Sequence, residues 1–172
     1  MTKSSKDGAS VPQVNEALRH ACSTEFGVLS STFLCQSIGI LQLKAPICVP
    51  DTVSVGEVIK LLQKNKVGAV LLTQPNGTLS GIFSERDCLL KVMGSAIDLN
   101  TTPIDTLMTK DPVSQPPDST IAYVLNLMSQ GGFRNIPIVD QDSIPIGLVS
   151  VKDLLDHIVN SYTESLLSFG EV

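Results

Sequence analysis

Two seven-residue stretches of the sequence combine a hydroxyl with a carboxylate, and both stretches open with a short apolar run. They read Gly-Ile-Phe-Ser-Glu-Arg-Asp at 81–87 and Gly-Leu-Val-Ser-Val-Lys-Asp at 147–153. If the serine starts a helix, its hydroxyl can cap that helix, and the free N–H groups beside it form an anion site. The aspartate then lies one turn further along the same side, where its carboxylate can accept both hydroxyls of a ribose. This chemistry suits a grip for a nucleoside phosphate and contains no catalytic group.

The same residue types are also typical of ordinary helix starts. Ser-x-x-Asp is a common capping pattern, so a single copy does not identify a ligand site. Arg86 and Lys152 can reach a phosphate from a helix start, but residues at such positions are equally often solvated. Gly81 and Gly147 allow close backbone approach where each strand emerges. The candidate residues for the grip are Ser84, Asp87, Ser150 and Asp153.

An internal repeat explains why the pattern occurs twice. Ile38 matches Ile104 and Leu41 matches Leu107, in each case 66 positions later. After a one-residue slip around the second strand of each copy, the offset of 66 returns at the two seven-residue stretches. An apolar stripe with the i, i+3, i+4, i+7 spacing of one helical face also recurs. Its members are Val55, Val58, Ile59 and Leu62 in the first copy and Ile121, Val124, Leu125 and Met128 in the second.

Each copy predicts the element order β-α-β-β-α, which makes the chain a mixed α/β (α+β) protein. One copy of about 60 residues would bury little apolar surface alone, so we expect the two copies to pack sheet to sheet with pseudo-twofold symmetry. The polar pairs Asp51-Thr52 and Asp118-Ser119 are predicted to cap the first helix of each copy. The predicted elements are extended pieces at 46–50 and 112–117, helices at 53–65 and 120–130, strands at 68–73, 79–83, 135–140 and 146–149, and closing helices from about 85 and 151.

The composition of the 172-residue chain argues against several classes of partner. The formal net charge is −5 and no run of Lys or Arg occurs, so no basic face is expected for nucleic acid. The apolar stretch 26–43 is broken by polar residues and predicts neither a secretory signal nor a membrane span, so a cytoplasmic location is expected. The histidines, His20 and His157, are far apart and no C-x-x-C pair occurs, so no metal site is predicted.

The repeats resemble the CBS-domain family over about residues 37–160. Both seven-residue stretches fit the family's G-h-h-[ST]-x-x-D signature, in which h is apolar, and residues 107–113 and 133–140 add further matching pieces. The resemblance implies a tandem CBS pair, or Bateman module. Its expected parts are an N-terminal extension at 1–36, partly disordered and able to form a helix, a first repeat at 37–98, and a second repeat at 99–172 that includes a C-terminal helix.

In function, the resemblance implies a non-catalytic regulatory sensor. Its clefts would bind an adenosine-type nucleotide (AMP, ADP, ATP or S-adenosylmethionine) as a regulatory ligand rather than a cofactor, and binding would alter association with a partner protein. The resemblance also implies a homodimer formed through the CBS helices. The alternative is a structural dimerisation or protein-interaction module whose clefts stay empty.

The resemblance implies two unequal clefts, each joining the signature of one repeat to the segment before the first strand of the other. Arg134 and Asn135 match a basic and polar pair that often touches phosphate, and their counterparts in the first repeat, Val67 and Gly68, offer no charge. Ile136 and Pro137 continue the strand after that pair. The first cleft would contain Ser84, Asp87, Thr109, Pro112 and Val113, and the second would contain Ser150, Asp153, Leu43, Pro46 and Ile47.

An enzymatic role finds little support in the sequence. Catalysis needs an activated nucleophile or a paired acid and base, and neither serine of the signatures has a histidine within sequence reach. The patterns G-x-S-x-G and G-x-x-x-x-G-K-[ST] are both absent from the sequence. We therefore predict no catalytic residues.

Overall fold

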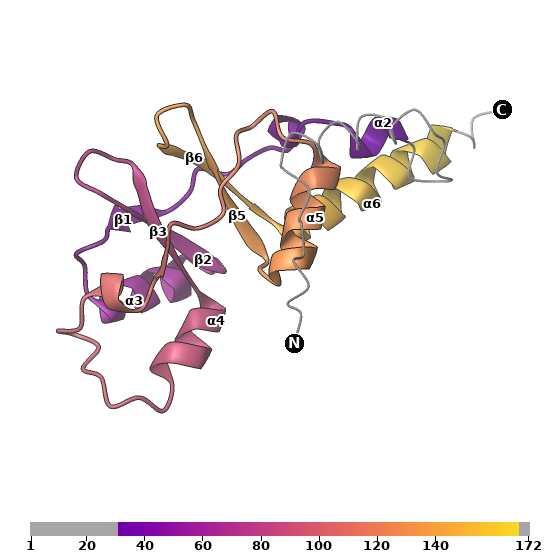
Figure 1. Ribbon diagram of the computed structural model, residues 1–172. Coiled ribbons are helices and arrows are strands. Elements are labelled where there is room, and N and C mark those ends of the chain that lie inside the picture. The colour runs from indigo at the N-terminus through magenta and orange to yellow at the C-terminus, as the bar shows by residue number, and fades with distance from the viewer. Residues whose placement is uncertain (1–30, 169–172) are drawn as a thin grey trace, which may run out of the picture.

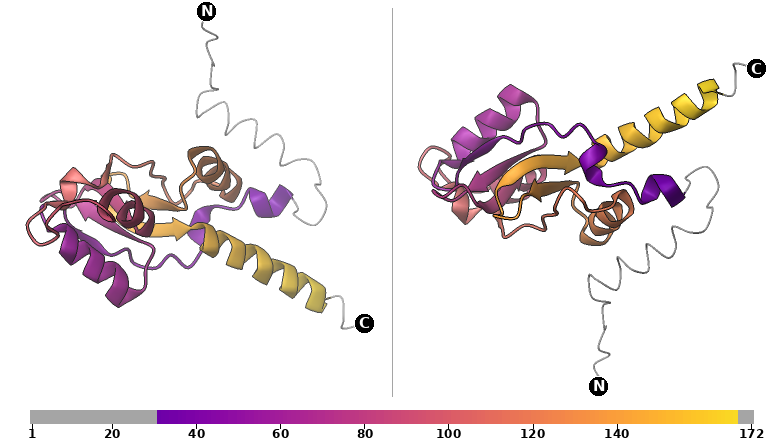
Figure 2. Two further views of the ribbon diagram at one scale, coloured as in Figure 1. Left: turned by 90° about the horizontal axis from the view of Figure 1, so that it is seen from below. Right: turned by 90° about the horizontal axis from the view of Figure 1, so that it is seen from above.

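Two β-hairpins lie next to each other in the middle of the molecule, and each carries its helices on the side away from the other hairpin (Figure 1). The structure is a computed structural model that describes residues 31–168. The disorder and the helix expected within residues 1–30 lie outside the described residues. The long last helix extends away from both hairpins, so its second half projects beyond the body of the molecule (Figure 2).

The first repeat follows the predicted order of elements closely. Its strands and helices are β1 (Cys48–Pro50), α3 (Val55–Asn65), β2 (Ala69–Thr73), β3 (Leu79–Ser84), α4 (Glu85–Asp87) and the π-helical turn η2 (Cys88–Val92), which continues α4. Before it come α2 (Ser31–Leu34) and the short 3₁₀ turn η1 (Ile38–Ile40). Strand β1 runs parallel to β2, and β2 pairs with β3 in antiparallel fashion.

The second repeat has the same core elements, but its leading strand is reduced. Its elements are η3 (Ile104–Thr106), β4 (Thr109–Lys110), α5 (Ile121–Gly131), β5 (Asn135–Val139), β6 (Pro145–Ser150) and α6 (Val151–Ser168). Strand β4 pairs with β3 of the first repeat, which gives a sheet of order β1-β2-β3-β4 beside the two-stranded sheet β5-β6. In the second repeat a single parallel bridge between Gln115 and Ile138 takes the place of β1.

The duplication holds at an offset of 66 through the second strand, so the predicted one-residue slip is wrong. Ala69 pairs with Ser84 in the first hairpin, and Asn135 pairs with Ser150 in the second. Asn135 lies 66 positions after Ala69, and Ser150 lies 66 positions after Ser84. The counterparts of Arg134 and Asn135 are therefore Gly68 and Ala69, in place of Val67 and Gly68. A fully buried strand is apolar at nearly every position, so matching residue types gives little information about its register.

The helix caps also differ from the prediction. Ser54 caps α3 and Thr120 caps α5, each through a side-chain oxygen that accepts from a backbone N–H three residues later. The predicted caps Asp51 and Asp118 come three and two residues earlier. Asp51 lies in the turn before α3, where its own backbone N–H donates to the carbonyl of Thr73 at 3.1 Å. The N-cap is the residue at which the backbone enters the helix. In both repeats the chain makes a further turn after the predicted aspartate and before the helix begins.

The two hydrophobic cores exchange their leading segments. Ile38 and Leu41 pack in the core of the second repeat, whereas Ile104 packs in the core of the first repeat. Backbone hydrogen bonds fix both exchanges, because the Ile38 N–H donates to Ser119 at 2.8 Å and the Ile104 N–H donates to Val53 at 2.9 Å. Each core therefore contains the leading segment of the other repeat, and this exchange couples the folding of the two repeats.

Candidate functional site

The serine and aspartate of each signature bond to each other at the start of a helix. Ser84 donates from its hydroxyl at 2.6 Å and from its backbone N–H at 2.9 Å to the same carboxylate oxygen, Oδ2 of Asp87. Ser150 donates to Oδ2 of Asp153 in the same way, at 2.6 Å and 2.8 Å. Both signatures are thus reciprocal helix caps, as the capping interpretation predicts. Capping uses one carboxylate oxygen, so a ligand would depend on the other oxygen, Oδ1.

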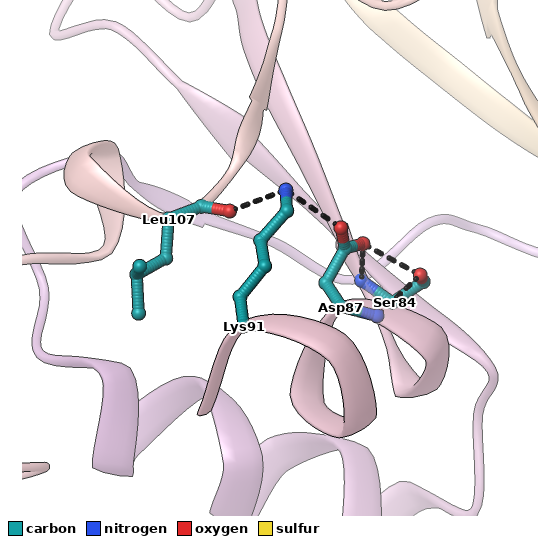
Figure 3. A network of polar contacts seen from close by, with 4 residues as sticks. All are labelled: Ser84, Asp87, Lys91 and Leu107. Atoms are coloured by element: carbon teal, nitrogen blue, oxygen red, sulfur yellow. Dashed lines mark hydrogen bonds and ion pairs between the residues drawn. The ribbon is translucent and has the colours of Figure 1, made fainter. Parts of the chain in front are cut away.

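In the first repeat, Oδ1 of the signature aspartate is already occupied by a lysine. The ammonium of Lys91 lies 2.7 Å from Oδ1 of Asp87 and donates to the carbonyl of Leu107 at 2.7 Å (Figure 3). Partial burial raises the pKa of Asp87, but the hydrogen bonds from Lys91 and Ser84 outweigh it, and the net pKa lies below the ordinary value. The carboxylate is therefore held in its charged form by groups of the protein itself.

In the second repeat, the corresponding oxygen is available. The residue at the position of Lys91 is His157, 66 positions later, and its side chain contacts the segment before the first repeat. Its Nε2 lies 3.3 Å from the side-chain oxygen of Gln36, and its ring stacks on Phe33 with centroids 5.0 Å apart. Among the residues that the structure describes, none bonds to Oδ1 of Asp153. The two signatures therefore differ at this oxygen, and the residue responsible, Lys91, was not among the predicted site residues. The i, i+4 spacing of Asp87 and Lys91 on a helix was the available signal.

The segment leading the second repeat lies beside the first signature, as expected for the first cleft. Thr109 pairs with Ile82, two residues before Ser84 on β3. Further along, Gln115 bridges to β5, so the chain between these points passes from one hairpin to the other. Pro112 and Val113 lie on this crossing segment, and Val113 is 45% exposed. The structure therefore brings these residues to the junction of the two repeats.

The segment leading the first repeat makes the equivalent crossing at the second signature. A Cβ atom on Gly147 would lie 3.0 Å from Cδ1 of Leu43, so Leu43 packs directly on β6. Four residues later the carbonyl of Ile47 accepts from the Leu71 N–H of β2 at 2.9 Å. Pro46 lies between these two contacts. Gly147 is needed at this point because a side chain would occupy the space of Leu43.

The starts of the two second strands, β2 and β5, lie close to each other. Nδ2 of Asn135 lies 3.9 Å from the position that a Cβ on Gly68 would take. Arg86 also crosses between the repeats, because its guanidinium donates to the carbonyl of Gly132 at 2.9 Å. Arg134 has an exposed side chain, and among the described residues no carboxylate forms an ion pair with it. Its guanidinium is therefore a cation that this part of the chain leaves without a counter-charge.

The remaining predicted residues are engaged elsewhere. Lys152 forms an exposed ion pair with Asp156, one turn further along α6, which raises the pKa of its ammonium. Ile136 is fully buried in the second core and Pro137 is buried beside it. A ligand in the cleft would therefore not contact either side chain. Val67 packs against the first core.

Two further properties of residues 31–168 bear on function. No group of three or more His, Cys, Asp or Glu side chains in this range is arranged to hold a metal ion. Within the same range, no helix is both long and apolar enough for a membrane crossing.

Comparison with known proteins decides the family. The CBS domain family matches the chain twice, at residues 41–94 and 104–160. The chain belongs to the CBS domain family. This confirms the resemblance seen in the two signatures, and the paired β-α-β-β-α units are the two CBS repeats.

Individual relatives agree with this assignment. A CBS domain-containing protein of Arabidopsis thaliana is 35% identical over 118 residues, which cover 69% of this chain but only 22% of the plant protein. A CBS-domain containing protein from Agrobacterium tumefaciens has a crystal structure with a TM-score of 0.64 and 28% identity, covering 70% of this chain and 98% of that one. A CBS domain protein from Pyrobaculum aerophilum, complexed with AMP, has a TM-score of 0.64 at 22% identity, and the match covers 72% of this chain and 98% of that one.

Proposed function

We propose that this CBS pair is a non-catalytic cytoplasmic sensor that binds an adenosine-type nucleotide, first in the cleft of the second signature. The observation that carries the proposal is Oδ1 of Asp153, which has no partner among the described residues while Oδ2 is fixed by the cap. A carboxylate held in this way is ready to accept ribose hydroxyls without a prior rearrangement. In the first cleft the corresponding oxygen must first be released from Lys91.

The phosphate end of the ligand has a candidate partner close to the same signature. Asn135 pairs with Ser150 across the hairpin, and the carbonyl of Arg134 accepts from the N–H of Val151, which follows Ser150. Arg134, whose side chain is exposed, therefore lies next to the N-terminus of α6, where the helix dipole also favours an anion. Gly68, the counterpart of Arg134, offers no such group at the first signature.

The fold itself is compatible with this ligand class. The protein from Pyrobaculum aerophilum, which shares the fold, was solved in complex with AMP. That likeness concerns the fold, so the argument for this chain rests on its own signatures. AMP, ADP, ATP and S-adenosylmethionine all contain the ribose that Asp153 would hold, and they differ at the end that Arg134 would meet.

The ligand would act by changing how the two repeats are oriented. Each cleft contains one signature and one crossing segment from the other repeat, so a bound nucleotide touches both. It can shift the orientation only by its difference in affinity for the two arrangements. Contacts that would be rearranged include Lys91 to Leu107 and Arg86 to Gly132. A partner protein that recognises one arrangement would then associate or dissociate.

The test is isothermal titration of AMP, and then ATP and S-adenosylmethionine, into three proteins: wild type, Asp153→Asn and Asp87→Asn. Asparagine keeps an oxygen for the cap but removes the charge, so both variants should fold. We expect saturable binding that weakens at least about tenfold, or about 1.4 kcal/mol, in Asp153→Asn and changes less in Asp87→Asn. An absence of binding heat for all three ligands in the folded wild type would contradict the proposal.

A structural role in dimerisation is the second candidate, and one specific observation favours it. Five large apolar side chains on or directly after the second helices of the two repeats are between 52% and 70% exposed. Four of them occur at matching positions, since Leu89 and Met93 correspond to Leu155 and Val159, 66 residues later, and Leu90 is the fifth. Two equivalent apolar faces related by the internal symmetry suit a second copy of the same pair.

Light scattering after size exclusion tests this dimer. Leu155→Glu places a charge within the exposed apolar face and should convert a dimer to a monomer. Asn160→Glu, an exposed polar position on the same helix, is the matched control and should leave the mass unchanged. A monomeric wild type, or a dimer that survives both Leu155→Glu and Leu89→Glu, would exclude this interface.

A further inference from the structure

A pocket lies near the start of β3, at the end of this strand opposite to Ser84 of the first signature. Its volume is about 510 Å³, and it is formed by the turn before α3, the residue after β2, and the segment 103–111. Ser80, near the start of β3, lines it, whereas Ser84 ends the same strand. Four residues of strand separate these serines by about 13 Å. The pocket is therefore centred away from Ser84, although its residues Lys110 and Asp111 lie between Thr109 and Pro112 of the first candidate cleft.

Two residues that line this pocket carry buried side-chain oxygens without partners. Among the described residues, the only buried side-chain oxygens or nitrogens that lack a hydrogen bond are Oγ of Ser80 and Oδ1 of Asp105. Both residues line the pocket, and Ser80 is only 8% exposed. Buried polar groups are almost always paired, because leaving one unpaired is unfavourable. A carboxylate accepts only, so a group that satisfies Asp105 must donate hydrogen bonds.

The charge of the lining indicates what kind of donor fits. Asp51, Asp105 and Asp111 contribute three carboxylates, against the single ammonium of Lys110. A negative pocket attracts cations. The described acidic residues do not form a group that could hold a metal ion, which favours an organic cation over a bare divalent ion. A primary ammonium supplies positive charge and three donors on one atom.

Ser80, Asp105 and Asp111 of the pocket are not repeated in the other copy of the duplication. At the offset of 66, Ile146 stands where Ser80 stands, Gly39 where Asp105 stands, and Ala45 where Asp111 stands. The fold therefore does not require a hydroxyl or a carboxylate at these places, since at each of them the other copy forms the same elements without one. Ser80 of the first repeat, and Asp105 and Asp111 of the second, are additions to what the fold needs.

We propose that this pocket binds a small organic molecule bearing a primary ammonium group. The ammonium donates to the carboxylate of Asp105 and to the hydroxyl of Ser80, which turns toward the pocket by rotation of its side chain, and the neighbouring carboxylates supply long-range attraction. Thr52 at the rim adds a further hydroxyl. This proposal is independent of nucleotide binding, because none of these residues belongs to either signature.

The test uses 1,4-diaminobutane as the probe, titrated into nucleotide-free protein at pH 7 and low salt. We expect saturable one-to-one binding that weakens at least tenfold in Asp105→Asn and severalfold in Ser80→Ala. Asp118→Asn, an exposed carboxylate outside the pocket, is the matched control and should bind as wild type does. Removal of an unpartnered hydroxyl should not lower the melting temperature, so Ser80→Ala also remains informative if Asp105→Asn folds poorly.

Three outcomes would overturn the proposal. The first is no saturable binding of the diamine to folded wild-type protein. The second is equal binding by wild type, Asp105→Asn and Ser80→Ala, which would place the diamine elsewhere. The third is equal binding of 1,4-butanediol, which lacks the charge, or saturation by Mg²⁺ that the diamine cannot reverse.

Discussion

The ammonium of Lys91 lies 2.7 Å from the carboxylate of Asp87, one helical turn earlier in the chain. The same ammonium donates to the carbonyl of Leu107, so one side chain joins the first signature to the segment that leads the second repeat. Lys91 is 35% exposed and Asp87 15%, so water screens this pair less than a fully exposed pair. In the second repeat His157 occupies the equivalent position and leaves Asp153 without such a tie.

Lys91→Met should therefore open the first cleft to ligand. Removal of the ammonium releases Oδ1 of Asp87, so adenosine, which carries no phosphate to interact with the lysine, should bind severalfold more tightly there. Titration calorimetry in an Asp153→Asn background isolates this cleft. Lys64→Met, an exposed helix lysine outside both clefts, serves as the control. Unchanged adenosine binding in the Lys91 variant would mean that the ion pair does not compete with ligand.

The stability of the chain should depend on Asp87 in a pH-dependent way. The pKa of Asp87 is below its ordinary value in the folded protein, so the charged form stabilises the fold. This contribution is fully present above the unfolded pKa of about 3.9. It is lost as the pH falls through the lower folded pKa. Urea unfolding of wild type and Asp87→Asn should show wild type as the more stable protein at pH 7, with the difference disappearing in acid.

The source of that pH dependence can be checked with a second pair of proteins. Lys91 contributes a hydrogen bond and a charge to the lowered pKa of Asp87. The loss of unfolding free energy caused by Asp87→Asn should therefore vary less with pH when Lys91→Met is also present. Urea unfolding of Lys91→Met and of the double variant, across the same pH range, measures this difference. A pH dependence of equal size with and without Lys91 would show that this lysine does not hold the carboxylate in its charged form.

The cap of α5 should be Thr120 and not the acidic residue before it. Thr120 accepts from the N–H of Tyr123 at 3.3 Å, whereas Asp118 is exposed and precedes the helix by more than one residue. Thr120→Ala should lower the free energy of unfolding by about 1 kcal/mol. Asp118→Ala should change it by less than about 0.5 kcal/mol. Chemical denaturation measures both, and the reverse order would contradict the assigned cap.

A side chain at Gly81 should force the side chain of Met108 to move. A Cβ on Gly81 would lie 2.4 Å from Sδ of Met108, closer than two such atoms can approach. Gly81→Ala should therefore destabilise the fold by about 1–3 kcal/mol. In a Met108→Ala background the same substitution should cost clearly less, because the space is then free. Strictly additive effects in this double-mutant cycle would show that the two residues do not compete for one space.

The local pattern of the sequence was sufficient for the elements and for the signatures. The helix predicted at 53–65 is observed as Val55–Asn65, and the strand predicted at 79–83 as Leu79–Ser84. Periodicity and the residues at chain reversals are properties of neighbouring positions, so they can be seen without the fold. The Ser-x-x-Asp pairs belong to this class, since each pair spans a single helical turn. The duplication can be recognised in the same way, because the helical periodicity and the Ser-x-x-Asp pair occur in both copies.

Only the tertiary structure decided the features that depend on distant neighbours. The register of the buried strand is set by its pairing with β3 or β6, and apolar residue types alone led to a one-residue error. The exchange of Ile38 and Ile104 between the cores, the tie from Lys91 to Leu107, and the unpaired oxygens of Ser80 and Asp105 all join residues far apart in sequence. Such contacts form because folding brings together surfaces that no local pattern relates, and they decide which carboxylate oxygen remains available.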